Sequence, residues 1–234
     1  MNLLAIDTGT ERMSLAVCRG DQVFTHAGVA GAQASTQLIP AILSLLDRAE
    51  LRLTDLQAIA FGRGPGAFTG LRTACSVAQG LALGAHLPLL PVDSLLCMAE
   101  TARALSPRVL ALLDARMGQV YAAAYEWRDN AWLTCMDVQL TQAHALTLPP
   151  PWLGLGFALA GNAMAAHSAG LQHLLNGGGL AVDVWPQADA MLTLAARAWA
   201  RSEAVAAADA LPLYVRDEVA RTMAQRLHDK RSVA

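Results

Sequence analysis

A short apolar motif that ends in aspartate occurs twice in this chain of 234 residues. LLAID at 3–7 recurs as VLALLD at 109–114, so that Asp114 stands 107 residues after Asp7. Short apolar runs that stop at a polar turn are typical of buried strands. Because the repeat relates two half-chains, it indicates a duplicated domain rather than a solenoid of short units.

Each half opens with strands and continues with alternating strands and helices. The first half predicts strands at 2–7, 13–19, 22–29, 57–62 and 88–92, and helices at 35–50, 69–84 and 93–104. Gly20-Asp21 is a two-residue hairpin signal between the second and third strands, and Ser35 or Thr36 is the predicted N-cap of the first helix. The second half predicts strands at 109–114, 119–127 and 131–138, and helices at 161–174 and 188–205.

This βββαβαβα pattern implies an α/β fold in which each half forms a mixed sheet with covering helices. We expect an N-terminal lobe at 1–104, a C-terminal lobe at 105–210 and a terminal segment at 211–234 that forms a helix. The C-terminal lobe is the weaker copy, with GGG at 177–179. Two such halves, each opening on a strand that ends in aspartate, resemble the actin, Hsp70 and sugar-kinase superfamily, whose two lobes close on ATP.

A glycine-rich segment, FGRGPGAFTGLR at 61–72, lies between a predicted strand and a predicted helix. Backbone N–H groups at such a turn can bind an anion, but the segment matches neither G-x-x-x-x-G-K-[ST] nor G-x-G-x-x-G. Phosphate binding, shaping of the backbone and contact with a partner therefore remain open. Pro65 fixes one φ, Thr69 is the predicted cap of the helix, and Gly66 and Gly70 permit close backbone approach. The candidate residues of this glycine loop are Gly62, Gly64, Pro65, Gly66, Thr69, Gly70 and Arg72.

The two aspartate turns are candidate phosphate contacts, because in active members of the superfamily both turns grip the phosphates. Here the first turn, Asp7-Thr8-Gly9-Thr10, is intact. It reads either as a phosphate contact or as a tight hairpin in which Asp7 caps its own loop. The second turn, which begins at Asp114, has Arg116 where a phosphate loop requires a small residue. Half of the clamp is missing, so efficient ATP turnover is not expected.

Two helices of the first half carry more apolar and small residues than one core contact requires. Hydrophobic residues make up 54% of the chain and charged residues only 15%, against about 25% charged in ordinary soluble proteins. Either the chain itself covers both sides of the helices at 35–50 and 69–84, or a second protein covers the outer side. The second reading predicts that Ile42→Glu or Ala78→Glu abolishes a complex and leaves a folded monomer. The predicted interface residues are Leu38, Ile42, Leu45, Leu46, Ala74, Val77, Ala78 and Leu81.

Several classes of function find no support in the residues. The net charge of −2 supplies no basic face for tight binding of nucleic acid, and no apolar run forms a clean membrane-spanning helix. Asp7 interrupts the N-terminus before an apolar signal region develops, so no signal peptide is expected. No histidine pair has the i, i+4 spacing of a helical metal site, and no cysteines are spaced for zinc. We expect a metal-free protein with buried thiols in a reducing cytosol.

The glycine loop, AIDT at 5–8 and DARMGQVY at 114–121 together resemble the bacterial TsaB family, formerly YeaZ. LAGNAMA at 159–165 and LPLYVRDEVA at 211–220 are similar to later blocks of that family, so the resemblance covers nearly the whole chain. It implies an actin-like fold without catalysis of its own. TsaB is the partner of the catalytic TsaD, which carries a metal-binding His-x-x-x-His motif that this chain lacks.

The resemblance also implies a place in tRNA modification. With TsaD and the ATPase TsaE, TsaB serves the transfer of a threonylcarbamoyl group from threonylcarbamoyl-adenylate, made by TsaC-type enzymes, to N6 of adenosine 37 of ANN-decoding tRNAs. ATP and a metal ion are then expected in the partner subunits, and tRNA is contacted only through the complex. The family's contact with TsaD, and its homodimer when TsaD is absent, map onto the helices at 35–50 and 69–84. Two alternatives remain: an ATP-dependent phosphotransferase of the same fold, and a peptidase, for which no nucleophile or metal pair is evident.

Overall fold

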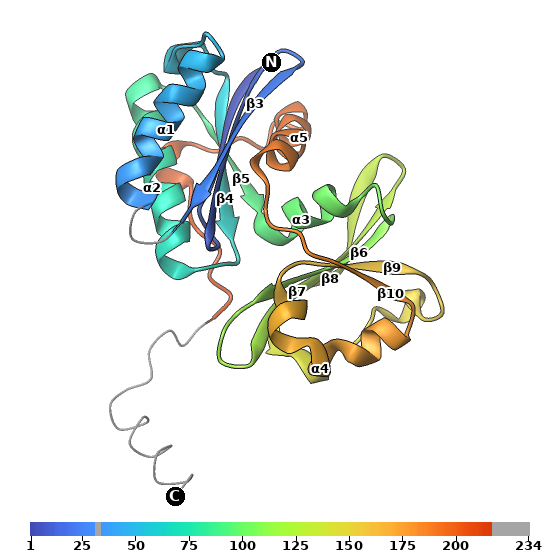
Figure 1. Ribbon diagram of the computed structural model, residues 1–234. Helices are drawn as coiled ribbons and strands as arrows, with labels where there is room; N and C mark the ends of the chain where they lie inside the picture. Colours follow the sequence, from blue (N-terminus) through green and yellow to red (C-terminus); the bar gives the residue numbers. More distant parts are fainter. Residues whose placement is uncertain (31–33, 217–234) are drawn as a thin grey trace, which may run out of the picture.

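The computed structural model describes residues 1–30 and 34–216 of the chain, and contains two five-stranded mixed sheets (Figure 1). The first sheet is formed by β1 (Asn2–Asp7), β2 (Arg12–Arg19), β3 (Gln22–Val29), β4 (Ala58–Gly64) and β5 (Leu89–Asp93). The second is formed by β6 (Arg108–Asp114), β7 (Gln119–Arg128), β8 (Ala131–Gln142), β9 (Phe157–Ala160) and β10 (Gly179–Val182). The α-helices in these ranges are α1 (Ala34–Arg48), α2 (Phe68–Ala85), α3 (Ser94–Ala102), α4 (Ala163–Asn176) and α5 (Ala188–Ala200). None of them is long and apolar enough to cross a membrane.

The two sheets have the same strand order, which confirms the duplication predicted from the repeated motif. The order is β3-β2-β1-β4-β5 in the first sheet and β8-β7-β6-β9-β10 in the second. In both, the three strands of the opening meander are antiparallel, and the two later strands run parallel to the first. β1 and β6 hold the same central place, and they end at Asp7 and Asp114.

The helices are exchanged between the two halves (Figure 1). α1 and α2 cover the outer face of the first sheet, where Leu4 points, and α5 covers its inner face, where Leu3 points. α3 packs on the inner face of the second sheet with Val109, and α4 covers the outer face with Leu110. α3 and α5 therefore lie between the sheets. The boundary expected near residue 104 divides the strands into two groups, but the helices cross it.

The second half departs from the predicted pattern after β8. Single turns of 3-10 helix, Ala143–Ala145 and Pro150–Trp152, follow β8 in place of a helix equivalent to α1, and Trp152 fills the core there. The short strands β9 and β10 were not predicted, and β10 starts inside the GGG segment. The helix predicted at 188–205 ends at Ala200. Residues 211–216 have no regular secondary structure, and the rest of the predicted terminal helix falls on 217–234, outside the described residues.

Candidate functional site

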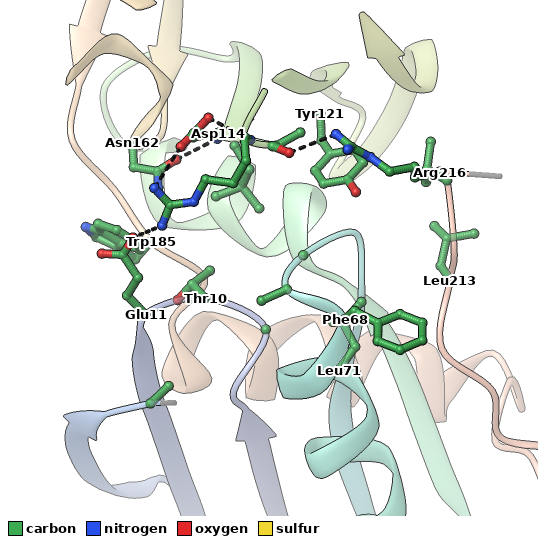
Figure 2. Close-up of a pocket in the computed structure, with 18 of the residues that line it drawn as sticks. Thr10, Glu11, Phe68, Leu71, Asp114, Tyr121, Asn162, Trp185, Leu213 and Arg216 are labelled. Atoms are coloured by element: carbon green, nitrogen blue, oxygen red, sulfur yellow. Dashed lines mark hydrogen bonds and ion pairs between the residues drawn. The ribbon is translucent and has the colours of Figure 1, made fainter. Parts of the chain in front are cut away.

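A cavity of about 650 Å³ lies between the two lobes, at the ends of β1 and β6 (Figure 2). This volume is within the range of small-molecule sites, roughly 300–1,000 Å³. Its wall is formed by the turn after β1, the glycine loop, the turn after β6, and residues 213–216. Among the predicted phosphate and glycine-loop residues, Gly9, Thr10, Gly66 and Asp114 line it.

Asp7, the last residue of β1, is fully buried. Its Oδ1 accepts a hydrogen bond from the backbone N–H of Gly9 at 3.0 Å, the contact expected of an aspartate that caps its own turn. Its Oδ2 has no hydrogen-bond partner among the described residues. Burial raises the pKa of Asp7 to about 7, and the Gly9 hydrogen bond opposes that rise only in part. The carboxyl group therefore belongs to the protein interior and is partly protonated at neutral pH.

The glycine loop packs directly on the turn after β1. The hydroxyl of Thr8 donates to the carbonyl of Gly70 at 2.7 Å, and the N–H of Ala67 donates to the carbonyl of Gly9 at 2.7 Å. A Cβ added at Gly66 or Gly70 would lie closer than 3.0 Å to the backbone of that turn. Glycine is required at both positions because two backbones touch. The loop thus joins β1 to the start of α2.

The predicted helix caps are wrong. The N-cap of α2 is Ala67, and Thr69 is an exposed residue inside the first turn of the helix. α1 begins at Ala34, so Ser35 and Thr36 lie inside it and are not its N-cap. The start of α2 is held instead by the N–H of Ala67, which is bound to the turn after β1. A hydroxyl cap is unnecessary where the preceding loop is fixed in this way.

The turn after β6 has a left-handed backbone at residues other than glycine. Arg116 and Met117 have φ values of 62° and 54°, and Gly118 follows with a φ of 75°. Asp114 accepts a hydrogen bond from the N–H of Arg116 at 2.9 Å, and its own N–H donates to Oδ1 of Asn162 at 2.9 Å. The second turn therefore binds its own polar groups, as the first turn does.

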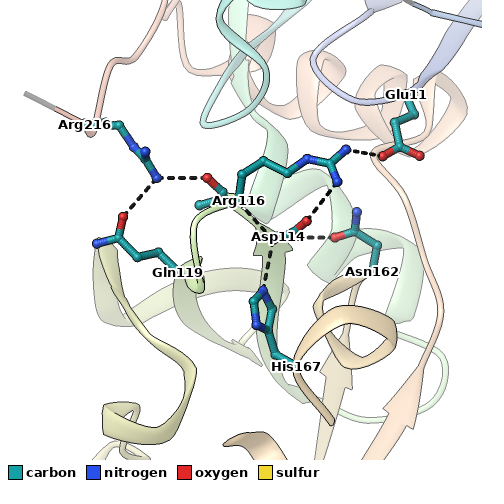
Figure 3. Close-up of polar contacts among 8 residues, drawn as sticks. Glu11, Asp114, Arg116, Gln119, Asn162, His167 and Arg216 are labelled. Atoms are coloured by element: carbon teal, nitrogen blue, oxygen red, sulfur yellow. Dashed lines mark hydrogen bonds and ion pairs between the residues drawn. The ribbon is translucent and has the colours of Figure 1, made fainter. Parts of the chain in front are cut away.

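A chain of polar and charged side chains extends from this turn to the other lobe (Figure 3). His167 Nε2 lies 2.9 Å from Asp114 Oδ1, and Arg116 Nη1 lies 3.4 Å from Asp114 Oδ2. Arg116 Nη2 reaches Glu11 Oε1 of the other lobe at 2.6 Å. Burial alone would raise the pKa of Asp114, but the hydrogen bonds from His167 and from the Arg116 backbone outweigh it, so the pKa is lowered. Sequence reasoning missed His167, because no spacing pattern relates it to Asp114, 53 residues away.

The charges that line the cavity cancel. Glu11 and Asp114 are negative, Arg116 and Arg216 are positive, and each is bound to other groups of the protein. Aromatic and aliphatic side chains form much of the remaining wall. Within residues 1–30 and 34–216, no three His, Cys, Asp or Glu side chains are grouped as a metal site. With the N–H of Gly9 also engaged by Asp7, this arrangement suits contact between the lobes better than capture of a polyanion.

Six of the eight predicted interface residues are core residues of the folded chain. They are Leu38, Ile42, Leu45, Leu46, Ala74 and Ala78. Each is at most 3% exposed and packs between the helices and the first sheet, so a partner cannot contact it. Val77 and Leu81 are half-buried. The prediction for these six was wrong because α1 and α2 both carry apolar or small residues on both sides, and periodicity did not show which side meets the sheet.

The outer sides of α1 and α2 expose a different set of residues, which we call the outer surface. Ile39 and Leu43 on α1 are 45% and 55% exposed, and Leu83 on α2 is 64% exposed. Gly80 and Gly84 of α2 have open space at their α-carbons. Exposed large apolar residues beside glycines allow another backbone to approach closely, so this surface has the character of a protein contact.

Comparison with known proteins shows which family this chain resembles. The family model described as TsaD, tRNA N6-adenosine threonylcarbamoyltransferase, matches residues 27–223. The tRNA threonylcarbamoyladenosine biosynthesis protein TsaB of Escherichia coli K12 is 34% identical over 228 residues, which cover 94% of this chain and 96% of that protein. The protein of the same name from Haemophilus influenzae is 33% identical over 241 residues, covering 94% and 95%.

The comparison with solved structures points to the same family as these relatives. YeaZ from Pseudomonas aeruginosa is 34% identical, superimposes with a TM-score of 0.80, and covers 91% of this chain and 99% of its own. The phosphotransferase and peptidase alternatives find no support in the comparisons. The resemblance carried by the glycine loop and the two aspartate turns is confirmed, and the chain belongs to the TsaB (YeaZ) family.

Proposed function

We propose that this chain is a non-catalytic subunit of tRNA threonylcarbamoyladenosine biosynthesis, which binds and activates a catalytic TsaD together with TsaE. The names of its curated relatives supply the pathway. One observation carries the non-catalytic role: the groups that would contact a phosphate, the Thr8 hydroxyl and the Gly9 N–H of the first turn and the Arg116 side chain of the second, are bound within the protein. Asp7 is buried under the glycine loop, and Arg116 is paired with Asp114 and Glu11.

The partner contact in this proposal is the outer surface of α1 and α2. Ile39, Leu43 and Leu83 supply apolar area, and Gly80 and Gly84 allow close approach. The centre of a protein interface is more apolar than its rim, and a few well-packed residues there contribute most of the binding free energy. The same surface forms a homodimer when TsaD is absent.

The other components follow from this role. TsaD holds the metal ion and carries out the transfer to N6 of adenosine 37, while ATP is bound by the partner subunits. The chain reaches ANN-decoding tRNA only through the complex, in agreement with its net charge of −2. It acts in the cytoplasm, where tRNA is modified.

The test places a charge on the outer surface and compares it with the same change elsewhere. Leu43→Glu and Leu83→Glu alter residues that are 55% and 64% exposed. Leu180→Glu on β10, where Leu180 is 56% exposed, is the matched control. Each variant is mixed with TsaD and TsaE of the same organism. Complex formation is followed by size exclusion with light scattering, and modification is measured on an unmodified tRNA transcript.

We expect both outer-surface variants to be folded, to bind TsaD at least about tenfold more weakly, and to lose modification, because a carboxylate buried there has no partner. Leu180→Glu should behave as the wild type. Wild-type binding by both outer-surface variants would place the contact elsewhere. Modification by TsaD and TsaE without this chain would remove the proposed function altogether.

A further inference from the structure

Residues 211–216 run from one lobe to the other along the edge of the cavity (Figure 2). The residues just before them are fixed to α2, since Nε2 of Gln79 donates to the carbonyls of Ala207 and Ala210 at 2.9 and 3.1 Å. The N–H of Leu213 then donates to the carbonyl of Arg63, in β4, at 2.7 Å. The first part of the segment therefore belongs to the N-terminal lobe.

Tyr214 connects this segment to the first turns of α2. Its hydroxyl accepts a hydrogen bond from Nε of Arg72 at 2.9 Å, and its ring centroid lies 5.4 Å from that of Phe68. The guanidinium of Arg72 lies 3.6 Å from the centroid of the Phe68 ring. A cation over an aromatic face is attractive, and tilted ring pairs at this distance add to it. The three side chains therefore form one group of contacts between the segment and the first turns of α2.

Arg216 binds the C-terminal lobe two residues later (Figure 3). Its Nη2 donates to the carbonyl of Ala115 at 2.8 Å and to Oε1 of Gln119 at 3.0 Å, and its Nη1 lies 3.2 Å from Sδ of Met117. All three acceptors lie in or beside the turn after β6. Hydrogen bonds from a charged donor are stronger than those between neutral groups. The guanidinium thus fixes the segment to the second lobe.

These contacts lie on the side of the molecule where the lobes are otherwise weakly joined. Away from the cavity, α3 and α5 pack between the two sheets through apolar side chains. Across the cavity, the Arg116–Glu11 ion pair has side chains 72% and 64% exposed, and such pairs contribute little. Lobes that are joined on one side can move about that joint by a hinge motion, and a second contact on the other side restricts this motion.

We propose that residues 211–216 are a strap that holds the two lobes closed on the cavity side. We also propose that Tyr214 couples the opening of the lobes to the position of the first turns of α2. The first part concerns the isolated chain. The second part rests on the proposed function, because α2 is the helix that meets the partner.

The distance between the lobes tests the strap directly. Spin labels are placed at Gln37→Cys on α1 and Ala166→Cys on α4, both exposed positions, after Cys18 and Cys135 are replaced by serine; the remaining thiols are buried. Electron–electron double resonance is then recorded on the isolated chain with Arg216→Ala, with Arg216→Lys, and with a matched arginine control. The control is Arg201→Ala, which removes only the local pair with Glu203.

Arg216→Ala should lengthen and broaden the distance distribution, Arg216→Lys should shift it partly, and Arg201→Ala should leave it unchanged. Gln119→Ala removes one hydrogen-bond acceptor of Arg216 and leaves Arg216 itself in place. This variant therefore tests the strap even if Arg216→Ala does not fold. Wild-type distributions in the folded Arg216 and Gln119 variants would overturn the strap.

Titration of TsaD tests the coupling. We expect Tyr214→Phe and Arg216→Ala to weaken TsaD binding roughly fivefold or more relative to Arg201→Ala. An Arg216→Ala chain that opens yet binds TsaD as the wild type does would overturn the coupling and leave the strap standing. If the wild type itself does not bind TsaD, the proposed function and the coupling both fail, and the distance measurement still decides the strap.

Discussion

The α-carbon of Gly62 lies directly against the carboxylate of Asp7. A Cβ added at Gly62 would come closer than 3.0 Å to Oδ2 and Cγ of that carboxyl group. The contact crosses the parallel pair of β1 and β4, in which Ile6 lies opposite Phe61. Gly62 is therefore part of the wall that buries Asp7.

Gly62→Ala should lower the free energy of unfolding by roughly 1–3 kcal/mol, because the added methyl group displaces a buried carboxyl group or a strand. Gly80→Ala is the matched control, since Gly80 is exposed in α2 with open space around it. It should raise stability by up to about 1 kcal/mol. Urea denaturation followed by circular dichroism measures both. A Gly62→Ala protein as stable as the wild type would show that the β1–β4 contact is looser than described.

Asp7→Asn should remove a dependence of stability on pH. Burial raises the pKa of Asp7 from its ordinary 3.8 to about 7, so between these values the folded chain holds a proton that the unfolded chain has released. The stability linked to that proton is present below about pH 4 and is lost as the pH rises through 7. Relative to Asp7→Asn, the wild type should lose up to roughly 4 kcal/mol over this interval. Urea titrations at several pH values give the difference, and parallel curves would contradict the burial of Asp7.

Asp114→Asn should change the pH dependence of stability in the opposite direction to Asp7→Asn. Burial favours the protonated acid, but the hydrogen bonds from His167 and the Arg116 backbone outweigh it, so the pKa of Asp114 lies below its ordinary value. The stability from the ionised form is complete above that ordinary value and is lost as the pH falls through the folded-state pKa. The variant should be about 1–2 kcal/mol less stable at neutral pH and closer to the wild type in acid. Thermal unfolding at neutral and acid pH, with His167→Gln beside it, provides the check.

Two neighbouring residues of α1 should respond differently to the same change. Ile42 is fully buried, whereas Leu43 is 55% exposed. Ile42→Glu should unfold or severely destabilise the N-terminal lobe, because it places an unpaired charge in the core. Leu43→Glu should give a folded chain with a circular dichroism spectrum like that of the wild type. A folded, soluble Ile42→Glu monomer would support the original interface prediction and not the packing described above.

The chain alone should release phosphate from ATP no faster than a heat-inactivated sample. The Thr8 hydroxyl and the Gly9 N–H are bound within the protein, and Arg116 occupies the second turn. The assay is run with Mg²⁺ and repeated with Asp7→Ala. Release clearly above the inactivated sample, and lost in Asp7→Ala, would show that the first turn is a working phosphate site.

The strand framework, apart from β9 and β10, could be predicted because its signals are local. The apolar runs at 2–7 and 109–114 stop at turns, and a strand is recognised by such a run alone. The outward side of α1 could not be predicted, because Ile39 and Leu43 are as apolar as the core residues beside them. The role of the glycine loop could not be predicted, because it depends on the backbone that lies opposite Gly66 and Gly70, and only the folded structure shows that contact.

The contacts of the second turn were beyond sequence reasoning for the same reason. Arg216 reaches Ala115 across 101 residues, and His167 reaches Asp114 across 53. Arginine and histidine have many roles, so neither residue type points to its partner. The exchange of α3 and α5 was also missed, because each helix is apolar enough to pack on either sheet.

That exchange has a consequence for how the chain is made. The strands of the first sheet are complete at residue 93, but the helix that covers their inner face, α5, spans residues 188–200. On the ribosome, Leu3, Ala5 and Ala60 therefore stay exposed until most of the chain has been synthesised. The nascent first half presents an apolar sheet face to chaperones, and a gene fragment that encodes only residues 1–104 is expected to yield an aggregating product rather than a separate lobe.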